Sequence, residues 1–127
     1  MNREYLFPFE KLEVWQLAKE LVFSIYDISK KFPSNEKYSL TSQINRAVIS
    51  IASNLAEGSS RISKKDQAYF SQLAYSSLME VVCQLNIGMD LDFLKKEEYV
   101  VLRQKIIVLS NKINALHRSQ KERAVKV

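Results

Sequence analysis

Glycine and proline are scarce in this sequence, because the 127 residues contain only two of each. Sheet proteins need turn residues about every eight to twelve positions, so this scarcity favours a few long helices. The length suits one domain, and a hydrophobic content of 46% is ordinary for a globular protein. We therefore predict one all-α domain over residues 1–127, folded as an up-and-down antiparallel four-helix bundle.

The local sequence predicts where the helices begin and end. Pro33 ends the first helix, and Gly58 is the expected left-handed C-terminal stop of the second. Ser63 and Asp66 resemble a capping box that opens the third. The four predicted helices span about residues 9–31, 34–57, 63–88 and 96–118. Residues 119–127 are expected to form a frayed basic tail.

Apolar residues exceed what one buried stripe per helix requires. In the fourth predicted helix a heptad-type core seam comprises Tyr99, Leu102, Ile106, Leu109, Ile113 and Leu116. The aliphatic residues outside that seam are Val100, Val101, Ile107 and Val108. In the first helix the stripe of Trp15, Ala18, Val22 and Ile25 is widened by Leu17, Leu21 and Ile28. This surplus predicts an oligomer, and the alternative is a broad core with scattered exposed aliphatic residues.

A strip of mostly short polar residues adjoins the core stripe of the second helix. At about 100° per residue, that strip contains Gln43, Arg46, Ser50, Asn54 and Glu57. Short side chains suit a close-packed, hydrogen-bonded seam, so we expect the strip to face the small residues of the third helix. Glu80 of the third helix is expected to pair with Arg46 across this polar seam.

The formal charge of +5 is unevenly distributed, because residues 103–127 carry a net +6 and the remainder a net −1. One basic cluster lies around the predicted turn between the second and third helices and comprises Arg61, Lys64 and Lys65. The other lies toward the C-terminus and comprises Lys112, Arg118, Lys121, Arg123 and Lys126. Such clusters predict binding to a polyanion, although basic residues at a helix C-terminus also complement the helix dipole.

The motifs needed for several other functions are missing from the sequence. One histidine and one cysteine provide neither a multi-histidine metal site nor an internal disulfide. No phosphate-binding glycine loop, nucleophile elbow or metalloprotease motif is present. The start of the chain has no signal-peptide pattern, and no apolar run is long enough to span a membrane. We expect a cytoplasmic protein that is not an enzyme and has no cofactor or metal.

The segment from Gln43 to Arg61, which ends Asn-Leu-Ala-Glu-Gly-Ser-Ser-Arg, resembles the signature of a bacterial four-helix bundle family. These are the intervening-sequence proteins, often encoded within insertions in large-subunit ribosomal RNA genes. Further similarity lies in residues 12–18, 31–38 and 76–80, so the resemblance covers nearly the whole chain. This chain has Asn45-Arg46 where the family often has two arginines, which leaves one positive charge fewer there.

The family is also similar to the accessory protein of diversity-generating retroelements, a barrel-like pentamer that binds nucleic acid and contacts a reverse transcriptase. The resemblance implies a homopentamer that binds RNA or DNA as an accessory factor through basic surfaces. The alternative is an adaptor that binds another protein and no nucleic acid. Base-specific recognition is not expected, because the aromatic residues mostly belong to helical core stripes.

Overall fold

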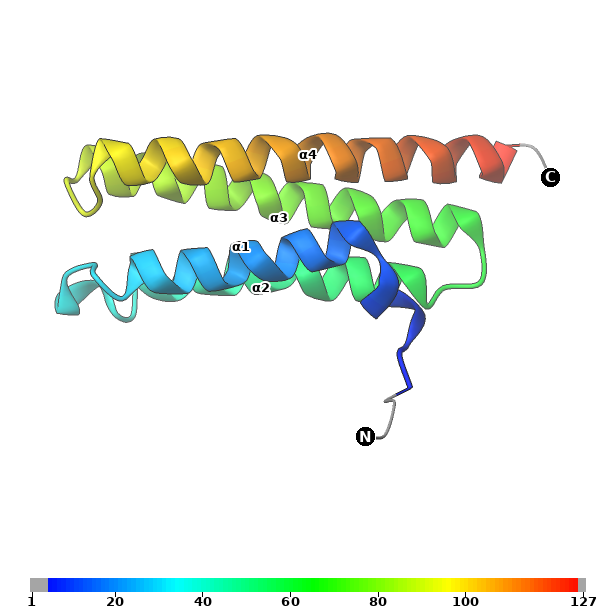
Figure 1. Ribbon diagram of the computed structural model, residues 1–127, viewed down its shortest axis with the longest axis horizontal. Helices are drawn as coiled ribbons and strands as arrows, with labels where there is room; N and C mark the ends of the chain where they lie inside the picture. Colours follow the sequence, from blue (N-terminus) through cyan, green and yellow to red (C-terminus); the bar gives the residue numbers. More distant parts are fainter. Residues whose placement is uncertain (1–4, 126–127) are drawn as a thin grey trace.

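A computed structural model describes residues 5–125 of the chain, and over that range it has four α-helices and no strand. The α-helices are α1 (Glu13–Ser29), α2 (Leu40–Ser59), α3 (Lys64–Asp90) and α4 (Lys96–Val125). Short 3-10 helices, η1 (Pro8–Lys11) and η2 (Ser34–Glu36), precede α1 and α2. Consecutive α-helices run antiparallel (Figure 1), which confirms the predicted four-helix bundle. No helix in the described range is long and apolar enough to cross a membrane.

The core is formed by one aliphatic stripe from each helix. The core stripe that helical periodicity predicts for α2, from Leu40 through Leu55 at three- and four-residue spacings, is buried at Ile44, Val48, Ile51 and Leu55. The predicted seam of α4 is buried at Leu102, Ile106, Leu109 and Ile113. In α1 the buried line is instead Val14, Ala18, Leu21, Ile25 and Ile28. The predicted α1 stripe was therefore partly wrong, because Trp15 and Val22 are only partly buried at the core edge. The Trp15 ring packs edge-on against Phe9 of η1, with 4.9 Å between ring centroids.

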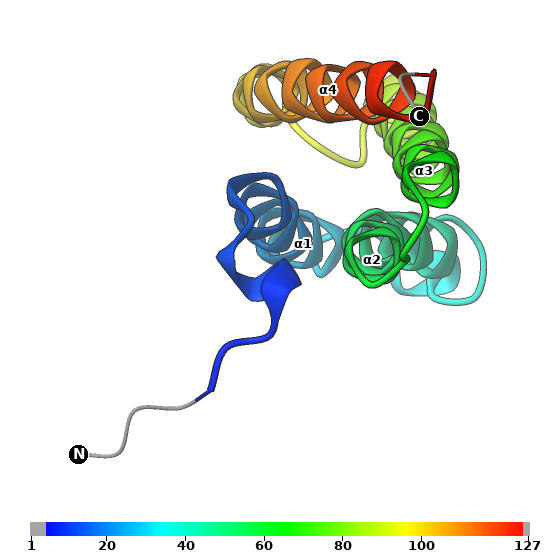
Figure 2. The same cartoon turned by 90° about the vertical axis from the view of Figure 1, so that its right-hand side faces the viewer.

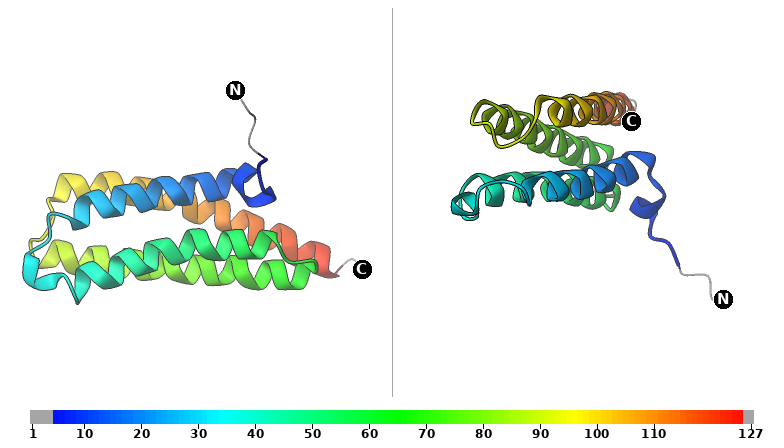
Figure 3. Two further views of the ribbon diagram at one scale, coloured as in Figure 1. Left: turned by 90° about the horizontal axis from the view of Figure 1, so that it is seen from below. Right: turned by 60° about the vertical axis from the view of Figure 1, so that its left-hand side comes forward.

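The four helices pack unequally around this core. The closest packing is between α2 and α3, and α4 packs mainly on α3. Of the helix pairs that are neighbours in the bundle, α1 and α4 contact each other least (Figure 2). The ends of α3 and α4 project beyond α1 and α2 on the side where α4 ends (Figures 1 and 3). Because α3 and α4 are antiparallel, the start of α3 lies beside the last turns of α4 at this projecting end.

Gly58 does not end α2 in a left-handed conformation, so that prediction was wrong. The helix continues through Ser59, and no glycine in the described range has a positive φ. Gly58 is buried inside the helix, where an added Cβ would lie 2.9 Å from the Cβ of Phe70. The glycine therefore allows α2 and α3 to approach closely beside the turn that connects them.

The beginnings of the first two helices also differ from the prediction. The first predicted helix is divided into η1 and α1, and α2 begins at Leu40 rather than near residue 34. Glu36 is the last residue of η2, which begins directly after Pro33. Its Oε1 accepts hydrogen bonds from Ser39 Oγ (2.7 Å) and Leu40 N (3.4 Å). A side chain just before α2 therefore caps it. At α3 the predicted cap is confirmed, because Ser63 Oγ accepts a 3.0 Å hydrogen bond from Asp66 N.

The last helix is longer than predicted, because residues 119–125 are helical rather than frayed. Gln120 is buried against α3, where its Oε1 accepts a 2.6 Å hydrogen bond from Ser71 Oγ. Good helix-forming residues, among them Lys121, Glu122 and Arg123, continue the helix past this contact. The final residues of the predicted tail, including Lys126, lie outside the described range.

Candidate nucleic-acid interface

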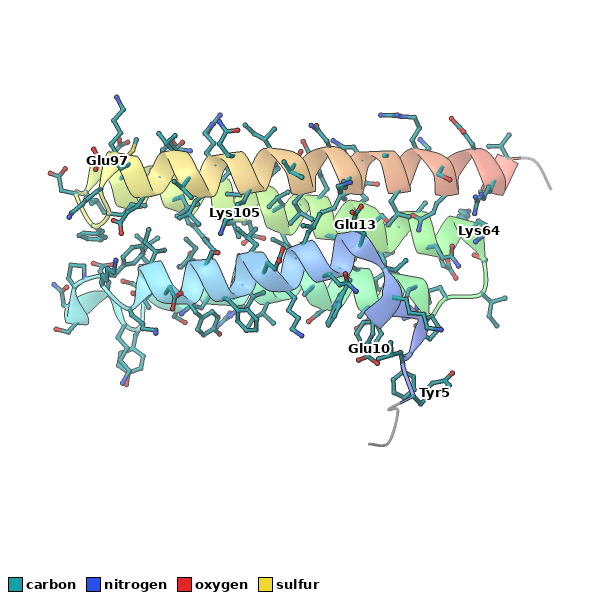
Figure 4. All side chains as sticks on the ribbon, viewed as in Figure 1. Tyr5, Glu10, Glu13, Lys64, Glu97 and Lys105 are labelled. Carbon is teal, nitrogen blue, oxygen red and sulfur yellow. The ribbon has the colours of Figure 1, made fainter. Side chains whose placement is uncertain are left out.

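The two basic clusters of the sequence meet at one end of the bundle. Lys64 and Lys65 open α3, and its first turn lies beside the last turns of α4 (Figure 4). Lys64 and Arg123 line one cavity at this end, whereas Lys65 and Lys121 line a neighbouring groove. We call this region the basic end and define it by Arg61, Lys64, Lys65, Arg118, Lys121 and Arg123.

Two side chains of the α2–α3 turn are held by local contacts. Lys64 Nζ donates a 3.1 Å hydrogen bond to Gln67 Oε1, and Gln67 Nε2 donates a 2.7 Å bond to the Arg61 carbonyl. The Arg61 guanidinium lies 4.7 Å from the ring centroid of Phe70. It also lies 3.6 Å from Glu57, in an exposed pair of a kind that contributes little stability. These contacts orient the turn and leave its positive charges at the surface.

Most cations of the basic end have no carboxylate partner within the described part of the chain. Arg61 makes the contact with Glu57, but no ion pair involves Lys64, Lys65, Arg118, Lys121 or Arg123 between residues 5 and 125. The N-terminus of α3 adds the positive end of its helix dipole at the same place. The basic end therefore presents several cations outside ion pairs, while Glu122 lines the groove of Arg118 and Lys121 and Asp66 lies in the first turn of α3.

One predicted binding residue lies elsewhere. Lys112 is in the middle of α4 and faces α1, where its Nζ lies 2.8 Å from Glu13 Oε1. Arg118 lines an open groove on α4 together with His117 and Lys121. Lys112 therefore belongs to the α1–α4 contact, and Lys126 is outside the described residues.

Part of the predicted polar seam joins α2 to α3. Ser50 Oγ and Ser77 Oγ are 2.9 Å apart, and Asn54 Nδ2 donates a 2.9 Å hydrogen bond to the Ser50 carbonyl. Farther along the same helix pair, Gln84 Nε2 is 3.5 Å from Gln43 Oε1. Short side chains thus allow close packing between the two helices.

The charged residues assigned to the polar seam lie at its exposed margins. Arg46, Glu57 and Glu80 are all exposed. No ion pair joins Arg46 to Glu80 in the described chain, so the predicted pairing was wrong. Burying two charges between closely packed helices carries a large desolvation penalty, and solvent exposure avoids it.

A cavity of about 250 Å³ at the basic end was missed by the sequence interpretation. Its apolar walls include Pro8, Leu12, Leu55 and Leu116, and Ser71 and Gln120 line it as well. A signal was present, because Gln120 follows Leu116 by four residues and so continues the core seam of α4. A polar residue at a core position indicates a buried hydrogen bond or a binding site.

The chemistry available here is anion binding. Among the described residues, no three histidine, cysteine, aspartate or glutamate side chains are placed to hold a metal ion. The cations of the basic end lie next to polar hydrogen-bonding groups and the exposed ring of Tyr69, which also lines the groove between Lys65 and Lys121. This combination suits phosphate groups and the planar surfaces of bases.

A comparison of the sequence with models of known protein families identifies the family of this chain. The model of the 23S rRNA-intervening sequence protein family matches residues 10–115. The chain belongs to this family. The matched region includes Arg61, Lys64 and Lys65 and stops before Arg118, Lys121 and Arg123.

The solved structures support the fold of this intervening-sequence protein. A crystal structure from Bacteroides thetaiotaomicron, described as a protein of unknown function from the S23 ribosomal protein family, matches with a TM-score of 0.76. The two sequences are 18% identical, and the match covers 82% of this chain and 97% of that chain. At this identity the similarity establishes the fold alone. No curated protein matches the chain.

Proposed function

We propose that this intervening-sequence protein is a non-catalytic homo-oligomer of the bacterial cytoplasm that binds RNA or DNA through its basic end as an accessory factor. The observation that carries the proposal is the gathering of Lys64, Lys65, Lys121 and Arg123 at one end without carboxylate partners in the described chain. Phosphate groups would supply the missing counter-charge, and release of condensed counterions would favour association.

Recognition on this proposal depends little on sequence. Lysine and arginine side chains contact phosphates, which are the same at every nucleotide. Tyr69 is 58% exposed and lines the same groove as Lys65 and Lys121, and an exposed ring near cations can stack on any base. The expectation that the aromatic residues mostly belong to the core was wrong, because Tyr69 is one of six exposed aromatic residues in the described range, with Tyr5, Phe7, Phe23, Tyr26 and Tyr38.

Oligomerisation is part of the proposal and rests on exposed apolar residues. On α4, Val100, Val101, Ile107 and Val108 are between 45% and 58% exposed. Between α1 and α4 a groove of about 380 Å³ is lined by Leu17, Phe23 and Val108 among others. Exposed apolar side chains in this number favour contact with further copies of the chain. Family analogy gives a pentamer, which would bring five basic ends into one assembly.

Fluorescence anisotropy with a labelled single-stranded RNA, combined with light scattering, tests the proposal. With about five phosphate contacts per site, affinity should fall roughly a hundredfold between 50 and 200 mM salt, since each contact adds about 0.7 to the slope of log affinity against log salt. Light scattering should give an oligomer at both salt concentrations. A stable oligomer that binds no RNA or single-stranded DNA at 50 mM salt would contradict nucleic-acid binding and favour the adaptor alternative.

A further inference from the structure

The cavity at the basic end combines three kinds of surface. Its walls are apolar, with Pro8 and Leu12 from the N-terminal side, Leu55 from α2 and Leu116 from α4. Lys64 and Arg123 line it from the start of α3 and the last turns of α4. Its polar lining comprises the buried pair Ser71 and Gln120 together with Ser59, Gln67 and Ser119.

The buried amide of Gln120 has spare hydrogen-bonding capacity. Ser71 is 3% exposed and Gln120 is 8% exposed, and their 2.6 Å hydrogen bond uses the Oε1 of Gln120. Among residues 5–125, Gln120 Nε2 donates a hydrogen bond to no acceptor. This atom is also not fully enclosed by the protein, because the only enclosed side-chain atom without a partner in that range is Gln84 Oε1. Because Gln120 lines the cavity, its amide N–H groups are available to an acceptor there.

We propose that this cavity binds one pyrimidine nucleotide of a single-stranded nucleic acid. A carbonyl of the base would accept a hydrogen bond from Gln120 Nε2, while the ring lies between the apolar walls. The phosphate would lie at Lys64 and Arg123, the cations that share the cavity. This inference rests on the proposed function and adds a single base-binding position to the basic end.

The size and polarity of the cavity favour this ligand over others. A volume of about 250 Å³ is just below the usual range of ligand pockets, roughly 300–1,000 Å³, and so suits a single ring better than a large ligand. An alkyl chain would fit the walls but would leave the Gln120 amide unpaired against hydrocarbon, which costs about 1–3 kcal/mol. Inorganic phosphate would engage the cations and leave the cavity unfilled. A pyrimidine nucleotide satisfies the walls, the amide and the cations together.

Calorimetry with uridine 5′-monophosphate and with ribose 5-phosphate, supported by amide chemical shifts, tests the proposal. The two probes share the phosphate and differ in the base, so the difference in affinity isolates the cavity. We expect uridine 5′-monophosphate to bind at least about threefold to tenfold more tightly, the value of one hydrogen bond, and to shift the amides of Ser71 and Gln120. Equal affinities, or shifts confined to other residues, would overturn the proposal.

A shape-preserving double variant sharpens this test. Ser71→Ala with Gln120→Leu removes both partners of the buried hydrogen bond, a change that can be nearly neutral for folding. It should lower the affinity for uridine 5′-monophosphate about threefold to tenfold and leave that for ribose 5-phosphate unchanged. Gln104→Leu, at an exposed glutamine of α4, is the matched control and should change neither. Wild-type binding by the double variant would contradict the role of Gln120.

Two further measurements separate the possible failures. If the double variant does not fold, Ser119→Leu fills the cavity from its wall and should have the same effect on the two probes. If uridine 5′-monophosphate fails to bind while single-stranded RNA still binds with steep salt dependence, the cavity proposal is wrong and the proposed function stands. If both fail at low salt, the proposed function is wrong as well.

Discussion

The two ends of the bundle differ in the carboxylates that surround their cations. At the basic end, Lys64, Lys65, Lys121 and Arg123 have no carboxylate partner in the described chain. At the far end, which holds the α1–α2 and α3–α4 connections, Lys31 lies 3.0 Å from Glu98 and Lys30 lies 3.3 Å from Asp27. Lys37, Lys95 and Lys96 of that end form no ion pair among the described residues. An open groove of about 880 Å³ there is lined by cations and carboxylates together. Within the described part of the chain, no carboxylate lines the basic-end cavity of Lys64 and Arg123 or the groove of Lys65 and Lys121, so carboxylates beside the cations, rather than the number of basic residues, distinguish the two ends.

The far end also holds a cluster of packed aromatic and aliphatic side chains. Phe32 and Leu94 are buried there, and the rings of Phe32 and Phe93 lie 5.7 Å apart. One hydrogen bond joins α4 to α3 at this end, because Tyr99 Oη donates to Asn86 Oδ1 at 2.8 Å, and Arg103 Nη1 of α4 donates to the same Tyr99 Oη at 2.8 Å. The basic end instead holds a cavity with an unused amide donor. One end thus serves stability, and the other provides the features of a site.

Replacing an aromatic residue at each end should give the largest contrast in stability. Phe32→Ala removes a side chain that is only 6% exposed and should lower the free energy of unfolding by about 3–5 kcal/mol. Tyr69→Ala at the basic end removes a ring that is 58% exposed, and its effect should stay within about 0.5 kcal/mol. Urea unfolding measures the free energy of unfolding of both variants, and equal losses would contradict the contrast between a buried ring at the far end and an exposed ring at the basic end.

The two glycines should respond differently to alanine. At Gly58 a Cβ would lie 2.9 Å from the Cβ of Phe70, an atom fixed close to the backbone of α3. Overpacking of about 1–3 kcal/mol should exceed the gain in helix propensity, so Gly58→Ala should destabilise by about 1–2 kcal/mol.

Gly88→Ala at the far end is the matched comparison. Its Cβ would meet the Cδ2 of Leu94 at 3.3 Å, and the end of a leucine side chain can move. The gain in helix propensity should offset that adjustment, leaving the free energy of unfolding within about 0.5 kcal/mol of wild type. Denaturant midpoints distinguish the two variants. If Gly88→Ala lowered the free energy of unfolding more than Gly58→Ala, the conclusion that Gly58 allows the close approach of α2 and α3 would be wrong.

The smallest expected effect concerns the pH dependence of the far end. The backbone N–H of Lys95 and then the side chain of Lys31 hydrogen-bond the carboxylate of Glu98 and lower its pKa. Because the folded-state pKa is lower, the contribution is present above the ordinary glutamate value of about 4.3 and is lost as pH falls through the folded-state pKa. Glu98→Gln should therefore lower the melting temperature slightly at pH 7, with the difference disappearing in strong acid. A difference in melting temperature that persists in strong acid would show that the effect of Glu98→Gln does not arise from the lowered pKa of Glu98.

The bundle was predictable because its determinants are local and periodic. Scarce turn residues and the repeats of α2 and α4 indicated long amphipathic helices, and Ser63 was correctly assigned as a cap. The interpretation of Gly58 was wrong because the sequence does not show that Phe70 of the next helix would lie against it. The end of α4 was missed because its order depends on the contact of Gln120 with Ser71, 49 positions earlier.

The candidate site was predictable in its residue types and less so in its arrangement. Both basic clusters were visible in the sequence, but their meeting at one end depends on the antiparallel pairing of α3 and α4. The assignment of Lys112 to the binding set did not anticipate Glu13 of α1, which lies far away in sequence. The cavity required knowledge of which segments converge at the basic end, and periodicity within one helix does not give that.

Matched charge reversal at the two ends tests the central claim most directly. Lys64→Glu, Lys121→Glu and Arg123→Glu at the basic end are compared with Lys30→Glu, Lys37→Glu and Lys96→Glu at the far end, which change the net charge equally. Anisotropy with single-stranded RNA over a salt series gives the slope of log affinity against log salt. The account predicts that the basic-end triple variant reduces that slope by about 2, at about 0.7 for each lost phosphate contact, while the far-end variant leaves it unchanged. Equal reductions in both variants would show that net charge alone governs binding and would contradict the account.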